Sequence, residues 1–280
     1  MNKILWKHIA TAIAAFSAAA TLITVLFNCD WIKGCWAYGA VGVILVALGS
    51  YAYAKWQVRT KKQIALTLSN EQKLTICEGN LFGQKGIICI PFNEYFDTHV
   101  GDGVVRKDSI HGQFINNCYE NREEELDDLI RKALSPFEYK ENKRRLNDCP
   151  IRKYPLGTCV DIIDKENTYV LFALTHFDDN DKANVKRVEY TEVTHKLMDH
   201  LAEIAENRPV FMPLFGTGLS RLQRTPQRIL IHLLDTIDFN DKWSIPGGIN
   251  IYIKSLDSVA VDLNTVESIV KKGITEKEEE

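Results

Sequence analysis

The stretch FMPLFGTGLSRL, residues 211–222, decides how this 280-residue chain is interpreted. An apolar run that begins at Val210 leads into the glycine loop 216–218, as in a buried strand that ends in a turn. Two glycines around a small hydroxyl residue let the backbone adopt positive φ and let a ligand approach closely. Thr225 and Pro226 then suit the start of a helix. Strand, glycine loop and helix in this order are the usual setting of a phosphate site in an α/β sheet, although any such turn can contain two glycines.

Composition narrows the class of protein. The formal net charge of -3 gives no basic excess, which argues against a general nucleic-acid binder. The seven cysteines form no CxxC pair and no zinc spacing, so the sequence predicts no metal site and, for most of them, buried reduced thiols in a cytosolic domain, while the redox state of Cys29 and Cys35 stays open. Its length allows two domains or one large domain.

Two apolar runs near the N-terminus, residues 9–27 and 36–53, contain no charged residue. Each is close to the roughly 20 residues that a helix needs to cross a bilayer. Trp and Tyr residues gather near their ends, as in an aromatic belt, and a second run directly after the first disfavours a signal peptide. We therefore predict a transmembrane α-hairpin over residues 1–58 and a linker, or helical extension, over residues 59–73.

Charges around the two runs predict their orientation. Lysines precede the first run, and lysines with Arg59 follow the second, whereas the connector contains only Lys33 beside Asp30. The positive-inside rule then places both termini in the cytoplasm. Small residues along both runs permit close helix packing, which suits a self-associating or pore-forming element as well as a plain anchor.

The rest of the chain alternates between expected strands and helices. The expected strands are residues 74–77, 86–91, 160–164, 169–175, 210–213 and 248–254, and the expected helices are residues 116–134, 184–207, 226–237 and 264–272. This pattern predicts one three-layer α/β/α domain with a mixed sheet over residues 74–256, followed by a C-terminal helix and charged tail over residues 257–280.

No common catalytic or nucleotide-binding motif is complete in this domain. Residues 79–86 (GNLFGQKG) contain glycines and a lysine, but their spacing fails for a P-loop, and there is no GxSxG or HExxH. Three polar or glycine loops remain at expected strand ends: residues 79–80, Asn93 with residues 101–105, and residues 216–219. Backbone N–H groups in such loops suit a diphosphate.

This pattern resembles the macro domain, a family of ADP-ribose-binding modules, over residues 74–254. Residues 79–81 (GNL) stand where family members have Gly-Asp-Ile, and the strand before Asn93 matches a family strand that ends in asparagine. The resemblance implies that Asn80 lies near the adenine, Asn93 near the distal ribose, and two glycine loops around the diphosphate. The ligand-binding residues that it implies are Asn80, Asn93, Gly101, Asp102, Gly103, Val104, Val105, Phe215, Gly216, Thr217, Gly218 and Leu219.

The chain departs from the family pattern at several of these positions. Asn80 replaces the aspartate that reads adenine, so a hydrogen bond to an exocyclic amine would carry no charge. The family's paired asparagines are reduced to Asn93, and Asp102 stands where a glycine is common. These changes leave the exact ligand open.

Two membrane spans ahead of a divergent macro domain are similar to the effectors of type II Thoeris, a bacterial anti-phage system. The resemblance implies a multi-pass protein of the bacterial inner membrane with a cytoplasmic macro domain and no enzymatic activity or cofactor. It also implies a histidine–ADP-ribose signal made from NAD by a Toll/interleukin-receptor-type enzyme. Binding of that signal would make the protein oligomerise and disrupt membrane lipid, killing the cell.

Two alternatives remain open from the residues. One is a membrane-anchored ADP-ribosyl hydrolase in which Asn93, Asp102 and His111 position water. The other is a membrane-tethered binding module without a switch.

Overall fold

The computed structural model describes residue 49 and residues 61–101, 104–142, 149–177, 182–218, 220–240 and 242–278. The chain divides into two compact units, residues 1–60 and residues 61–280. Apart from residue 49, the two apolar runs predicted to cross a membrane lie outside the described residues. Among the residues that are described, no helix combines the length and apolar character that a membrane span requires.

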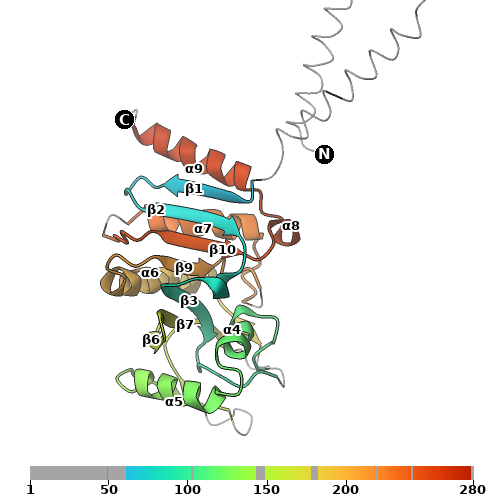
Figure 1. Cartoon of the computed structure of the whole chain (residues 1–280), viewed down its shortest axis with the longest axis vertical. Coiled ribbons are helices and arrows are strands. Elements are labelled where there is room, and N and C mark those ends of the chain that lie inside the picture. Colours follow the sequence, from blue (N-terminus) through green and yellow to red (C-terminus); the bar gives the residue numbers. More distant parts are fainter. Residues whose placement is uncertain are drawn as a thin grey trace, which may run out of the picture. The chain divides into compact units, whose positions relative to one another are not determined.

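The second unit is built on one mixed sheet (Figure 1). Its strands, in spatial order, are β1 Gln63–Thr67, β2 Lys73–Glu78, β10 Ile249–Ile253, β9 Val210–Pro213, β3 Ile87–Asn93, β7 Asn167–Phe177 and β6 Cys159–Asp164. The five inner strands run parallel, while β1 and β6 pair antiparallel with their neighbours. The short strand β8 Ala183–Asn184 pairs with the end of β7, and β4 Lys140–Glu141 pairs with β5 Arg152–Lys153 apart from this sheet.

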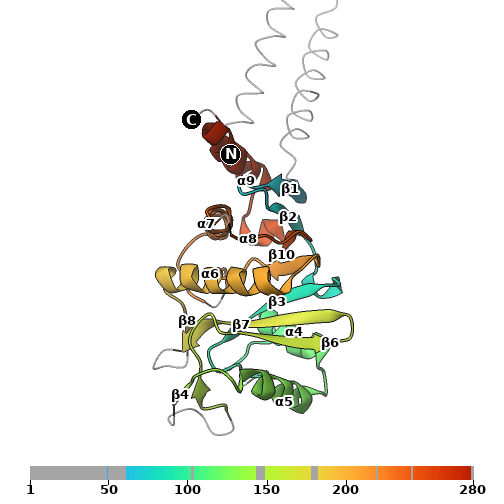
Figure 2. The ribbon, with the colours of Figure 1, turned by 90° about the vertical axis from the view of Figure 1, so that its left-hand side faces the viewer.

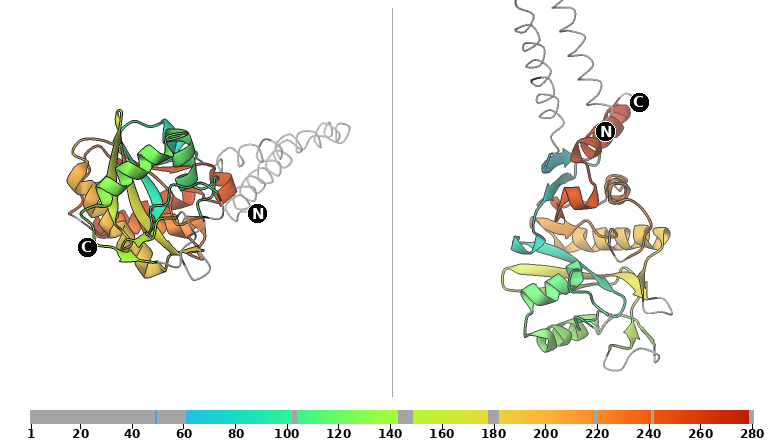
Figure 3. Two further views of the ribbon diagram at one scale, coloured as in Figure 1. Left: turned by 90° about the horizontal axis from the view of Figure 1, so that it is seen from below. Right: turned by 90° about the vertical axis from the view of Figure 1, so that its right-hand side faces the viewer.

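Helices cover both faces of the sheet, as Figures 2 and 3 show. One face packs against α6 Arg187–Ile204, α7 Pro226–Asp238 and α9 Leu263–Glu278, and the other against α4 Ile110–Cys118 and α5 Glu123–Leu134. A single turn of 3-10 helix, η1 Leu81–Gly83, follows β2, and α8 Leu256–Val259 follows β10. The predicted α/β fold with a mixed sheet is therefore confirmed.

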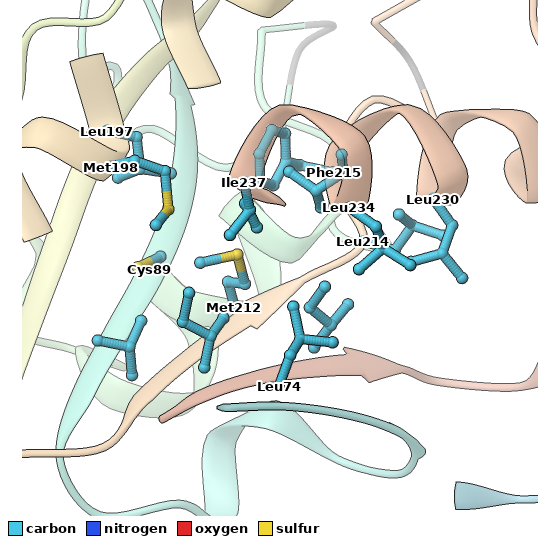
Figure 4. Packing of buried hydrophobic residues seen from close by; sticks show 14 of the residues in the cluster. Leu74, Cys89, Leu197, Met198, Met212, Leu214, Phe215, Leu230, Leu234 and Ile237 are labelled. Carbon is cyan, nitrogen blue, oxygen red and sulfur yellow. The ribbon is translucent and has the colours of Figure 1, made fainter. Parts of the chain in front are cut away.

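The strand β3 shows why this sequence forms a two-sided sheet. Ile87 and Cys89 belong to the core on the α6 and α7 face, whereas Ile88, Ile90 and Phe92 belong to the core on the α4 and α5 face. An inner parallel strand is buried on both sides, so its sequence is a continuous apolar run. Figure 4 shows the first of these cores, where Cys89 and Met212 from the strands face Leu197, Met198 and Leu234 from the helices.

The segment before β2 differs from its prediction as a linker or helical extension. Residues 63–67 form the edge strand β1, in which Ile64 and Leu66 are buried and the residues between them are exposed. This period of two is that of a strand with one covered face. Figure 1 shows α9 beside β1. Leu263 and Val266 of α9 lie in the same core as Ile64.

The predicted helix over residues 116–134 is two helices. Ser109 caps α4 by accepting a hydrogen bond from the Gly112 N–H (3.0 Å), so that helix begins earlier than expected. Asn121 has a left-handed φ of 59°, which interrupts the helical path before α5. The apolar spacing of residues 184–207 predicts Val188 on the buried side of that helix, but Val188 is 70% exposed, since it lies in the first turn of α6.

Candidate functional site

The strands β3 and β9 separate towards their C-terminal ends. They pair only through Ile87 and Ile88 of β3. The Ile87 N–H donates across this pair to the Pro209 carbonyl (3.1 Å), and backbone groups in a strand point to the same side at every second residue. The nitrogen of Pro91 therefore faces the side where β3 has no partner strand, and the proline removes no ladder hydrogen bond.

A cavity of about 410 Å³ lies at this edge, where β3, β7 and β9 end. That volume falls within the range of roughly 300–1,000 Å³ for small-molecule sites. Seven of the residues predicted to bind ligand line it: Asn93, Val104, Val105, Phe215, Gly216, Thr217 and Gly218. The structure thus brings residues from both predicted loops to one cavity. Asp102, Gly103 and Leu219 lie outside the described residues.

The second glycine loop leaves donors available for a ligand. Gly216 has a φ of 86°, and a Cβ atom there would lie 2.7 Å from Cε2 of Tyr190, so glycine is required. Within the described part of the chain, none of the backbone N–H groups of residues 216–218 has an acceptor. Consecutive free N–H groups at the end of a strand form an anion-binding concavity.

The first glycine loop is closed by its own backbone. Gly101 has a φ of 138°, and its N–H donates to the Val105 carbonyl while the Val104 N–H donates to the Gly101 carbonyl, both at 3.0 Å. Gly101 does not line the cavity, whereas Val104 and Val105 do. The loop therefore contributes an apolar wall at this point.

Asn93 is buried at the end of β3 and organises the turn that follows. Its Oδ1 accepts a hydrogen bond from the Tyr95 N–H (3.0 Å), and its Nδ2 donates to Oδ2 of Asp97 (2.8 Å). Both ends of the amide are thus engaged with the protein. The predicted contact of Asn93 with the distal ribose stays a prediction.

Asn80 follows β2, whereas the cavity lies where β3, β7 and β9 end. It is exposed after β2 and caps η1, with its Oδ1 accepting a hydrogen bond from the Phe82 N–H (3.1 Å). Asn80 is not among the residues that line the cavity. The predicted contact of Asn80 with the adenine therefore stays a prediction.

His111 lines the cavity from the first turn of α4 and packs on the Phe92 ring, with ring centroids 3.6 Å apart. Its Nε2 lies 2.7 Å from the Asp97 carbonyl oxygen, which only accepts hydrogen bonds, so Nε2 carries the proton. Burial lowers the pKa of His111 from 6.5 to about 3. At neutral pH the ring is uncharged and unsuited to act as a general acid.

The depressed pKa of His111 predicts a loss of stability in acid. Between pH 6.5 and 3 the unfolded chain binds a proton at this ring and the folded chain does not, so stability present above 6.5 declines as the pH falls. The expected decline of the free energy of unfolding is up to about 1.4 kcal/mol per pH unit. Urea unfolding of the full chain should show a shallower decline for His111→Gln, and equal declines would contradict this account.

Tyr190 of α6 packs against the second glycine loop. It is 1% exposed, its ring centroid lies 5.3 Å from that of Phe215, and its hydroxyl donates to the Phe215 carbonyl (3.4 Å). Tyr190→Ala should lower the free energy of unfolding by about 3–5 kcal/mol by leaving a cavity. Tyr190→Phe keeps the ring and should cost only about 0.5–1.5 kcal/mol. Thermal unfolding of both variants and of the wild type measures these losses. Equal midpoints for Tyr190→Ala and Tyr190→Phe would show that the packing of the Tyr190 ring against the loop is unimportant.

Several cavity residues were not predicted from sequence. Arg106, Asp108, Ser109, Ile110, Thr175 and Ser220 all line the cavity. For Arg106, Asp108 and Ile110 the available signal was Ser109, a residue type that often caps helices and that here begins a helix at this edge of the sheet. Ser220 has a buried hydroxyl without a hydrogen-bond partner among the described residues, and no sequence pattern marks it.

Comparisons with known proteins agree with this architecture. The chain matches the family model described as Thoeris protein ThsA, Macro domain, over residues 74–254. The Thoeris protein ThsA of Bacillus amyloliquefaciens (strain Y2) is 25% identical over 240 residues, which cover 83% of this chain and 80% of that protein.

Solved macrodomains show the same fold at low identity. The Oceanobacillus iheyensis macrodomain with ADP has a TM-score of 0.52 and 10% identity, covering 75% of this chain and 97% of that one. A mutant of that macrodomain with ADPR has a TM-score of 0.52 and 10% identity, covering 75% and 99% of the two chains. Because the family model spans more than half of its length, the chain belongs to the ThsA macro-domain family of the Thoeris anti-phage system.

Proposed function

We propose that the cavity binds an ADP-ribose-derived signal nucleotide of the histidine–ADP-ribose type. A Toll/interleukin-receptor-type enzyme would make this signal from NAD. Binding would then lead the N-terminal apolar runs to assemble and disrupt the inner membrane. The observation that carries the proposal is that residues of both loops line one cavity, where the N–H groups of residues 216–218 have no acceptor among the described residues.

The chemistry of the cavity supports a nucleotide diphosphate. Backbone N–H groups bind phosphate without a cluster of lysines, and Arg106 is the one cation that lines the described part of the cavity. Apolar residues such as Val104, Val105 and Phe215 supply walls for a sugar or a base. The combination suits a ligand with both a charged centre and flat, less polar ends.

The site supports binding better than hydrolysis. His111 is neutral, with a pKa near 3, and its protonated nitrogen already faces the Asp97 carbonyl. Asn93 uses both ends of its amide within the protein. Neither residue is therefore placed to transfer a proton to or from water, and we propose that the protein is a receptor rather than an enzyme.

The membrane step rests on the sequence of residues 1–58. A ligand shifts a protein between two states only to the extent that it binds one of them better. We propose that the nucleotide favours an oligomeric state of the full chain, in which the apolar runs act together on lipid.

The test uses the full chain in lipid vesicles. Calorimetry with ADP-ribose and with histidine–ADP-ribose measures binding, and release of a trapped dye measures membrane disruption. We expect binding of the conjugate and ligand-dependent dye release. Absence of binding to either nucleotide would refute the receptor, turnover of an ADP-ribosylated substrate would support the hydrolase instead, and binding without dye release would indicate a tethered module.

A further inference from the structure

We propose that Arg106 and Asp108 form a subsite for a zwitterionic α-amino-acid group at the edge of the cavity. The guanidinium would take the carboxylate of the ligand, and the Asp108 carboxylate would take its ammonium group. This inference rests on the proposed function, because it names the part of the site that separates an amino-acid conjugate from ADP-ribose itself.

The two side chains form a two-point ion pair that is open to solvent. Nε of Arg106 donates to Oδ1 of Asp108 (2.8 Å), and Nη2 donates to Oδ2 (2.5 Å). Both residues line the cavity, and their side chains are 56% and 69% exposed. A pair with this exposure contributes little to folding stability, so a ligand can replace it at small cost.

The backbone that presents this pair is held without its help. The Ser109 hydroxyl donates to the Arg106 carbonyl (2.6 Å), and Nε2 of Gln113 donates to the Asp108 carbonyl (2.8 Å). A Cβ atom at Gly112 would lie 2.2 Å from the Arg106 carbonyl oxygen, so the turn packs directly on the helix. The turn before α4 therefore stays in place when the two side chains exchange partners.

Both groups carry their charges at neutral pH. The Arg106 guanidinium holds the pKa of Asp108 below its usual value, and the charge of Lys254 acts in the same direction. Asp108 in turn raises the pKa of Arg106. The cavity edge thus offers one fixed positive and one fixed negative group next to each other.

Complementarity follows from this arrangement. An arginine binds a carboxylate through two parallel hydrogen bonds, and a carboxylate binds an ammonium group as a charge-assisted acceptor. A ligand that carries both groups on one carbon replaces one ion pair by two and leaves no charge unpaired. A ligand with only a negative group would leave Asp108 facing an anion, and a neutral sugar would leave the internal pair intact.

The test compares two nucleotides on single variants of the full chain. Calorimetry measures the affinity for histidine–ADP-ribose and for ADP-ribose in Arg106→Gln and Asp108→Asn. We expect each variant to lose at least about tenfold in affinity for the conjugate and less than about threefold for ADP-ribose. Lys85→Gln and Glu166→Gln are the matched controls, because these residues form an exposed ion pair (2.6 Å) next to the N-terminal end of β3, away from the cavity. Both controls should bind like the wild type.

The outcomes separate this inference from the proposed function. An equal loss of affinity for both nucleotides would overturn the subsite and indicate that Arg106 and Asp108 contact the phosphates. Unchanged affinity for both nucleotides would also overturn it, and would show that the two residues form an ordinary surface ion pair. Failure of the wild-type chain to bind either nucleotide would instead refute the receptor itself, and the subsite with it. Unchanged thermal unfolding midpoints confirm that the variants are folded.

Discussion

Replacing Gly218 with glutamate is expected to abolish binding of the signal nucleotide. Gly218 lines the cavity, and a Cβ atom built there meets no described protein atom within 4 Å, so a larger side chain fits at this position without displacing the protein. Its carboxylate would occupy the space beside the free N–H groups of residues 216–218 and repel the phosphates. We expect affinity to fall at least about 100-fold, or about 2.7 kcal/mol, in calorimetry with the full chain.

The control for this variant is Gly83→Glu. Gly83 is exposed in η1, and a Cβ atom there also has open space around it, so the change adds the same charge away from the cavity. Gly216→Glu is a less informative variant, because its positive φ and the contact with Tyr190 would strain the loop whatever the charge. Retained affinity in Gly218→Glu would show that the nucleotide binds elsewhere.

A charge in the second apolar run is expected to abolish membrane disruption and to leave nucleotide affinity unchanged. Gly42 falls near the middle of residues 36–53, and an aspartate at the centre of a membrane helix costs about 2.5–3.5 kcal/mol of insertion free energy. Gly42→Asp and Ala47→Asp should therefore prevent insertion or assembly. Ligand-induced dye release and survival of cells that contain the signal measure the first effect, and calorimetry measures the second.

The matched control is Gly34→Asp, which places the same charge in the connector between the two runs. It should retain dye release. Unchanged membrane activity in Gly42→Asp would remove the second run from the mechanism. Loss of nucleotide affinity in the same variant would mean that nucleotide binding depends on the apolar runs, contrary to the proposal that the macro domain alone binds the nucleotide.

The sequence predicted the inner sheet because buried parallel strands have a simple signature. The runs at residues 86–91, 210–213 and 248–254 became β3, β9 and β10. The ends of parallel strands meet at one edge, so the loops after β3 and β9 were expected to converge, and the cavity contains residues from both. The resemblance to the macro domain added the identity of the ligand class, which no periodicity provides.

Other features depended on contacts that are distant in sequence. The strand β1 is a short period-two segment whose cover, α9, comes almost 200 residues later, so local pattern alone could not separate it from a linker. The break between α4 and α5 follows from the left-handed backbone at Asn121, which any helical pattern overlooks. In the sequence Arg106 and Asp108 are typical of exposed surface residues. Only the fold shows that they pair with each other and line the cavity.

The packing of β1 against α9 joins the first described strand of the chain to its last helix. Lys61, the first residue of this unit, forms an ion pair with Glu267 (2.5 Å), and Ile64 and Val266 share one core. A pull transmitted along the backbone from residue 60 would therefore act first on β1, which both β2 and α9 hold, at the opposite end of the strand order from β7 and β6. Trimming the C-terminus into α9 would therefore loosen the attachment of β1.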